Sequence, residues 1–185
     1  MFIQTENTPN PLTMKFLPGV TVLASGTATI TDKADAKKRS PLAHALFGIE
    51  HVTSVFLAED FITVTKAEDV AWSTLKPAVL TTIMEHFVAG LKVLNDGEAN
   101  AETKLDDNED PIVKQIKELI DTRVRPAVAM DGGDIVYKDF KDGIVKLELH
   151  GSCQGCPSST ATLKNGIENM LKHYVPEVVA VEAVA

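Results

Sequence analysis

An acidic run with few apolar residues, between Asn95 and Asp110, limits the fold of this chain more than any other feature. The run holds seven acidic residues and one lysine, so it cannot bury enough apolar surface to offset the entropy lost on ordering. Each half of the chain must therefore build its own hydrophobic core. We predict a domain at residues 1–97, an acidic linker at 98–109 and a second domain at 110–185.

The N-terminal half predicts a small domain of strands and helices. Runs rich in β-branched and aromatic residues predict strands, and apolar residues at helical spacing predict a long helix. Catalytic residue types are not concentrated in this half. The expected elements, in chain order, are extended segments at 2–5 and 13–17, a short helix at 40–47, a hairpin of 52–58 with 61–66, and a helix at 71–94.

The C-terminal half predicts the element order α-β-β-α-β. Its first helix, at 112–124, is expected to end before Pro126, because a proline disfavours helical backbone at the preceding residue. With helices and strands mixed in both halves, the predicted fold class is α+β, with two small α+β domains joined by the acidic linker. The remaining elements are strands at 134–140 and 144–150 joined by the turn Lys141-Asp142-Gly143, a helix after Pro157, and a last strand at 178–184.

The charge and the apolar pattern exclude several classes of protein. The net charge is −8, whereas phosphate binding needs clustered Lys and Arg, so we expect no nucleic-acid partner. We expect no membrane span either, since no stretch approaches the roughly 18 consecutive apolar residues of a membrane helix. The N-terminus lacks the features of a signal or transit peptide. We therefore predict a cytoplasmic protein, unless a presequence has been removed.

The only two cysteines, Cys153 and Cys156, lie between a predicted strand and a predicted helix. Backbone N–H groups at the start of a helix, together with the helix dipole, favour thiolate over thiol. Thiolate is the form that binds soft metals and iron–sulfur clusters. Gly151 and Gly155 let the backbone bend tightly and leave room for a bulky ligand, and Pro157 suits the first position of a helix. The loop therefore predicts a metal or cluster site with both cysteines as ligands.

One chain offers only two thiolates, whereas a cluster or a structural zinc ion takes about four protein ligands. Either other residue types complete the site, or a second copy of the chain brings its own Cys153 and Cys156 across a symmetric dimer. A shared site divides when such a dimer parts, which suits delivery of a cluster better than permanent storage.

Three other interpretations of the cysteine pair remain open. The first is a dithiol–disulfide oxidoreductase of the thioredoxin type, although no βαβ pattern precedes the loop. The second is a structural zinc site completed by His150, although we expect His150 to be exposed at the end of its strand. The third is a chance spacing of two cysteines.

Two adjacent glycines lie between Asp131 and Asp134, ahead of the first C-terminal strand. Adjacent glycines are typical of a tight turn. Two carboxylates without further oxygen ligands are only a weak indication of a calcium site. We therefore predict a structural turn here, with the two aspartates as turn residues.

Both halves resemble parts of a known family. The C-terminal half does so in Arg125-Pro126, Asp131-Gly132-Gly133-Asp134-Ile135 and Gly151-Ser152-Cys153-Gln154-Gly155-Cys156-Pro157-Ser158-Ser159. The N-terminal half does so in Phe2-Ile3-Gln4-Thr5-Glu6, Thr8-Pro9-Asn10-Pro11 and Lys15-Phe16-Leu17-Pro18-Gly19. The first set resembles the C-terminal NifU (Nfu) domain, and the second resembles the N-terminal domain that accompanies it in Nfu scaffold proteins.

This resemblance implies an iron–sulfur cluster scaffold or carrier and not an enzyme. Members of the family bind a [4Fe–4S] cluster between two subunits through this motif, receive it from upstream assembly machinery and pass it to apo-proteins. Carried over by position, the ligands here are Cys153 and Cys156, and the cluster-bound form is a homodimer. The resemblance further implies that the N-terminal domain binds no cluster and helps partner recognition.

Overall fold

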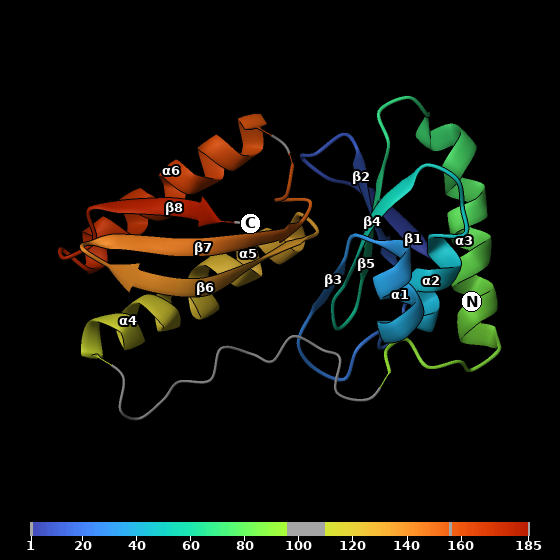
Figure 1. The fold of residues 1–185 in the computed structure, drawn as a ribbon, viewed down its shortest axis with the longest axis horizontal. Coiled ribbons are helices and arrows are strands. Elements are labelled where there is room, and N and C mark those ends of the chain that lie inside the picture. The colour runs from blue at the N-terminus through green and yellow to red at the C-terminus, as the bar shows by residue number, and fades with distance from the viewer. Residues whose placement is uncertain (1, 96–109, 156, 185) are drawn as a thin grey trace. The chain divides into compact units, whose positions relative to one another are not determined.

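The structure, a computed structural model, describes residues 2–95, 110–155 and 157–184 (Figure 1). It divides the chain into two compact units, Met1–Ala101 and Glu102–Ala185. Each unit combines helices with a sheet, which confirms the predicted α+β class with two domains. The predicted linker at 98–109 lies outside the described residues.

The N-terminal unit is a five-stranded antiparallel sheet in the order β1-β2-β5-β4-β3, with its helices on one face (Figure 1). Side chains at alternate strand positions, such as Phe16 and Ile62, meet Leu42 and Ile83 of the helices in one core. The elements are β1 (Gln4–Asn7), β2 (Thr13–Leu17), β3 (Ala28–Ile30), α1 (Lys33–Arg39), α2 (Pro41–Leu46), β4 (Val52–Leu57), β5 (Ile62–Lys66) and α3 (Trp72–Val88).

Two parts of this unit differ from the sequence prediction. Helix α3 ends at Val88 and not at residue 94, because Gly90 adopts a left-handed backbone with a φ of 64°, which is a common way to end a helix. Strand β3 and helix α1 were not predicted. Strand β3 has only three residues, and α1 buries a single side chain, Ala36, so neither shows a periodic apolar pattern.

The C-terminal unit is a three-stranded sheet in the order β6-β7-β8, which shares one core with its helices. Strands β6 and β7 are antiparallel, whereas β7 and β8 are parallel. The core includes Ile116 and Leu171 from the helices and Ile135 and Leu147 from the sheet. The elements are α4 (Pro111–Leu119), the π-helical turn η1 (Ile120–Val124), α5 (Arg125–Met130), β6 (Gly133–Lys141), β7 (Ile144–Gly151), α6 (Pro157–Tyr174) and β8 (Ala180–Val184).

The prediction that the first helix of this unit ends before Pro126 is wrong. The chain passes from α4 through η1 into α5 without leaving helical geometry. In η1 the backbone N–H of Arg125 donates to the carbonyl of Ile120, five residues earlier, so the turn is one residue wider than in an α-helix. Pro126 then lies in the first turn of α5, directly after the wider turn, and wide turns of this kind are one of the ways in which a helix accommodates a proline.

A turn joins β6 to β7 at the predicted place, but Lys141 belongs to β6, so the turn has two residues and not three. Asp142 and Gly143 both have positive φ, 53° and 78°, which is the pattern of a type I′ hairpin. At the other end of the hairpin Gly133 lies opposite Gly151 in the strand register. The hairpin therefore ends in two facing glycines, beside the cysteine loop.

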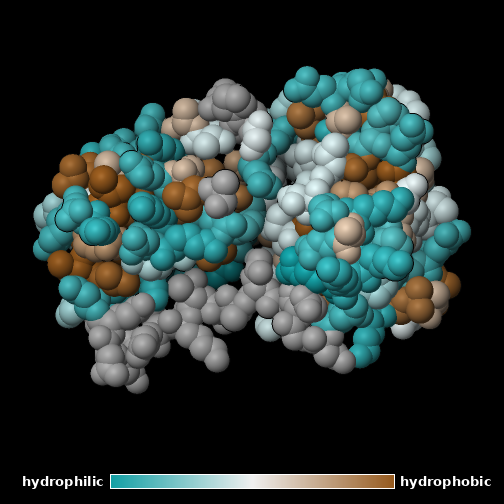
Figure 2. All heavy atoms as spheres, viewed as in Figure 1, coloured by the Kyte–Doolittle hydropathy of each residue, from teal (hydrophilic) through white to brown (hydrophobic). Residues whose placement is uncertain are grey.

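The surface view in Figure 2 is mostly hydrophilic, with separate apolar patches on each unit. Within the part of the chain that the structure describes, no helix is both long and apolar enough to cross a membrane.

Candidate metal centre

The cysteine loop leaves the end of β7 and enters α6, the strand-to-helix junction expected from the sequence. Gly151, the last residue of β7, has a φ of 62°, and Gly155 has a φ of 80°, so two left-handed glycines bracket Cys153. Of the two predicted ligands, the structure describes Cys153, whereas Cys156 lies outside the described residues.

Cys153 is buried in the core of the C-terminal unit, with 6% of its surface exposed. Its sulfur faces the backbone of Gly133, the first residue of β6, and a Cβ added there would lie less than 3.0 Å from Sγ. The next two residues, Gln154 and Gly155, are exposed. The loop thus turns its first cysteine inward and the following residues outward.

The environment of Cys153 does not favour thiolate in the metal-free chain. Burial raises the pKa of the Cys153 thiol to about 11, and the carboxylates of Asp131 and Asp134 act in the same direction. The expectation that the helix start would stabilise a thiolate is therefore wrong for Cys153. Cys153 precedes the first residue of α6 by four positions and lies in the core. It is therefore separated from the helix start in sequence, and burial disfavours its charged form.

Ser152 ties the cysteine loop to the turn ahead of β6. Its backbone N–H donates to the carbonyl of Gly132 over 3.1 Å, and its hydroxyl donates to the carbonyl of Asp131 over 2.6 Å. On the other side, the backbone N–H of Cys153 donates to the carbonyl of His150 over 3.3 Å. Hydrogen bonds to the turn ahead of β6 and to the end of β7 thereby fix the backbone at Cys153.

The two glycines ahead of β6 are required for different structural reasons. Gly132 has a φ of 79°, which fits the predicted turn. Gly133 has no such backbone requirement, because it is not among the residues with positive φ, and its missing side chain makes room for Cys153. The sequence pattern predicted a turn role for both glycines and gave no prediction of this contact. The second glycine was the available signal, since a glycine that no turn requires often marks a close approach.

Asp134 is more than a turn residue. Its carboxylate is buried and accepts two hydrogen bonds from Arg125, from Nε over 2.8 Å and from a terminal nitrogen over 3.0 Å. These hydrogen bonds to Asp134 raise the pKa of Arg125 above its usual range. Asp121 adds a second carboxylate at 3.3 Å from Arg125. This ion pair was not predicted, because a separation of nine residues across a helix end matches no regular spacing.

The prediction that His150 is exposed is wrong, since 6% of its surface is accessible. Burial lowers the pKa of its imidazole, and its Nε2 lies 3.8 Å from a carboxylate oxygen of Glu148, which also pairs with Lys138. Among the described residues, no three His, Cys, Asp or Glu side chains are placed to share a metal ion. Cys156 lies outside the described residues, so the zinc interpretation with His150 stays an open alternative.

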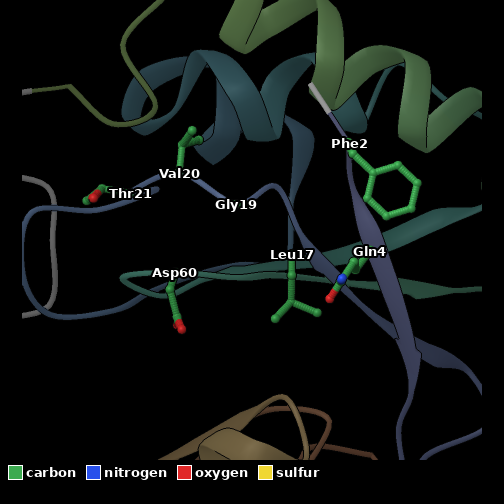
Figure 3. A pocket seen from close by; sticks show the side chains of 7 residues that line it. All are labelled: Phe2, Gln4, Leu17, Gly19, Val20, Thr21 and Asp60. Carbon is green, nitrogen blue, oxygen red and sulfur yellow. The ribbon is translucent and has the colours of Figure 1, made fainter.

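The N-terminal unit carries a surface pocket of about 520 Å³ (Figure 3). Leu17 and Asp60 point to the same side of the sheet in this view. None of the residues that line the pocket is a cysteine or histidine, so it offers no soft metal ligand. They are Phe2, Gln4, Leu17, Gly19, Val20, Thr21 and Asp60.

Comparison with known proteins gives a consistent result for both units. Residues 3–90 match the family described as "Scaffold protein Nfu/NifU N terminal", and residues 116–182 match the family described as "NifU-like domain". Proteins of Drosophila sechellia and Drosophila simulans, each named "NFU1 iron-sulfur cluster scaffold homolog, mitochondrial", are 52% identical over 184 residues. The match covers 100% of this chain and 65% of each relative.

A solved structure also matches. The solution NMR structure of a NifU-like protein from Saccharomyces cerevisiae is 27% identical, with a TM-score of 0.47, over 52% of this chain and 86% of that one. The two family matches show that the two parts of the sequence carry the domains of one family, in the family's order. The chain belongs to the NifU-like (Nfu) family of iron–sulfur cluster scaffold proteins.

Proposed function

We propose that this protein is an iron–sulfur cluster scaffold or carrier, which binds a [4Fe–4S] cluster between two copies of the chain and transfers it to apo-proteins. The observation that carries the proposal is the Cys-x-x-Cys loop, placed between β7 and α6 of a unit that matches the NifU-like domain. Family membership and the relatives' names support an iron–sulfur role. The chain spans 65% of the length of those relatives, so the activity of the whole protein is part of the proposal.

In this proposal Cys153 and Cys156 are the cluster ligands. A cubane cluster takes four thiolates, and each chain supplies two, so a two-fold symmetric homodimer completes the site. The cluster is cargo, and it leaves when thiolates of an apo-protein replace those of the carrier. The same chemistry makes upstream assembly machinery the donor and apo iron–sulfur proteins the acceptors, and it requires no catalytic turnover by this chain.

Reconstitution of the full chain with iron and sulfide, without oxygen, tests the proposal. We expect a brown dimer with about four irons per two chains, because four thiolates surround one cubane cluster. Absorbance, the iron and sulfide content per chain, and the mass in solution measure this. Cys153→Ala and Cys156→Ala should each abolish loading while circular dichroism stays that of the folded chain.

Two outcomes would contradict the proposal. If either single variant retained the full iron and sulfide content, the cluster would not be shared through this pair. A colourless monomer would also contradict it: uptake of zinc alone would favour a structural zinc protein, and reversible oxidation of the pair with a thiol partner would favour an oxidoreductase.

The cytoplasmic location stays a prediction from the sequence. The names of the Drosophila relatives place those proteins in mitochondria. Fractionation of cells that express the protein, with detection by antibody in the mitochondrial and cytosolic fractions, decides between the two compartments.

A further inference from the structure

The contact between Cys153 and Gly133 leaves no room for a side chain at residue 133. A Cβ added to Gly133 would lie less than 3.0 Å from Sγ, 3.0 Å from the carbonyl oxygen of His150 and 3.2 Å from the backbone nitrogen of Cys153. Real Cβ atoms almost never approach a heavy atom more closely than 3.0 Å. Sγ of Cys153 thus occupies space that only a glycine at residue 133 leaves free.

Several backbone contacts hold Cys153 in this inward position. Gly133 pairs with Gly151 across the hairpin, so the loop after β7 folds back over the first residue of β6. Ser152 bonds to the turn that precedes Gly133, as described above. The hydroxyl of Thr160, in the helix after the loop, donates to the carbonyl of Cys153 over 3.2 Å. The inward position is therefore fixed from the hairpin and from α6.

A cluster shared with a second chain has to meet its ligands at the surface, because the partner approaches from outside. A cysteine with 6% of its surface exposed is turned away from such a partner. The loop between the two left-handed glycines, Gly151 and Gly155, must then open for Cys153 to reach a cluster. The structure thus shows the thiol in a position that differs from the one needed for shared ligation.

We infer that Gly133 is a positioning residue, which provides a buried resting position for the Cys153 thiol while the carrier is empty. The inference rests on the proposed role of Cys153 as a ligand. Within that role, the resting position shields the thiol from oxidants and alkylating agents while the chain holds no cluster. A side chain at residue 133 removes the position and leaves Cys153 permanently exposed to them.

Alkylation of the metal-free full chain tests the inference. In a Cys156→Ser variant Cys153 is the only thiol, and its rate of reaction with N-ethylmaleimide is compared, at one pH, with the rate in denaturant. We expect the folded chain to react at least about tenfold more slowly, as for a group that reacts only through local opening. Adding Gly133→Ala should bring the rate to within about threefold of the denatured chain, because the opened loop no longer closes.

Gly166→Ala is the matched control, because a Cβ at this exposed position of α6 meets nothing within 4 Å. It should leave the alkylation rate unchanged. If Cys153 of the folded Cys156→Ser chain reacts as fast as in denaturant, or if Gly133→Ala leaves its protection intact, the inference is wrong. Because no metal is used, failure of cluster loading would leave this result standing, and the two proposals can fail separately.

A double-mutant cycle in urea covers the case in which Gly133→Ala lowers the stability of the whole C-terminal unit, because fast alkylation would then report unfolding. The urea midpoint is measured for Gly133→Ala, for Cys153→Ala and for the double variant. If the sulfur is what the added methyl meets, Gly133→Ala should lower the midpoint more in the presence of Cys153 than in the Cys153→Ala chain. Equal losses in the two backgrounds would assign the effect to the backbone alone and overturn the inference.

Discussion

Arg125 and Asp134 join the helical segment to the start of the sheet beside the cysteine loop. The guanidinium donates to both carboxylate oxygens, and the side chains are 23% and 6% exposed. Asp134 also accepts a hydrogen bond from the backbone N–H of Ile135 over 2.8 Å. Because Gly133 is the adjacent residue, this pair fixes the segment against which the Cys153 sulfur lies.

Arg125→Ala should lower the free energy of unfolding by about 2–4 kcal/mol, because it removes the cation and two hydrogen bonds from a buried carboxylate. Arg123→Ala is the control: Arg123 is exposed and stacks over the ring of Tyr174, so its loss should cost under about 1 kcal/mol. Urea unfolding followed by circular dichroism measures both. Similar small losses in the two variants would show that the Arg125–Asp134 pair contributes little.

At the scale of the elements, the β6–β7 hairpin depends on its two-residue turn. Gly143 has a φ of 78°, and a Cβ there would lie 2.7 Å from Cγ2 of Val179 and 3.0 Å from the carbonyl oxygen of Glu177. The turn therefore also contacts the segment that leads into β8. Gly143 thus brings the turn of the hairpin against the segment that precedes the third strand.

Gly143→Ala should destabilise the C-terminal unit more than Gly155→Ala. Both positions have left-handed backbone, which costs an alanine about 1 kcal/mol, but a Cβ at Gly155 meets nothing within 4 Å. The difference between their urea midpoints isolates the collision with Val179 and Glu177. Equal midpoints would mean that the segment before β8 moves aside without cost.

Local signals in the sequence predicted the parts of the fold and the site that depend on few residues. The Asp142-Gly143 turn and the junction that carries Cys153 are of this kind, since turn chemistry and a strand followed by a helix are readable over short windows. The wide turn before Pro126, the burial of His150 and the contact of Gly133 with Cys153 were not predicted. Each depends on residues that become neighbours only after folding, and no short window contains them.

At the scale of the whole molecule, the two units have separate cores that share no residue among those described. The only tryptophan, Trp72, lies in α3, packs edge-on against Phe16 and donates to the carbonyl of Pro11. Its fluorescence therefore reports on the N-terminal unit alone. Circular dichroism reports on both units together. A transition that circular dichroism shows and Trp72 fluorescence does not therefore belongs to the C-terminal unit, so the two units can be distinguished in the intact chain.

His86 makes the stability of the N-terminal unit depend on pH. It is 4% exposed, and burial lowers the pKa of its imidazole below the usual 6.5. The unfolded chain then binds a proton that the folded chain does not, so this contribution to stability is complete above about pH 6.5 and is lost as the pH falls. Urea midpoints from Trp72 fluorescence should fall between about pH 7.5 and 5.5.

His86→Gln should reduce that fall, because the amide keeps a donor for the carbonyl of Lys92, which Nε2 of His86 contacts at 3.0 Å, and does not titrate. All other residues of the unit are the same in both chains, so the difference between the two pH profiles belongs to residue 86. Parallel profiles would assign the pH dependence to other groups.

The parallel pairing of β7 with β8 predicts an order in which the surroundings of Cys153 assemble during folding. Parallel neighbours require a crossover, here the whole of α6, whereas the β6–β7 hairpin closes through two residues. Contacts that are near in sequence form sooner than contacts that need a long loop to close. We therefore expect Gly133 and Gly151 to come together before β8 is added, so that the position that receives the Cys153 sulfur forms early in folding.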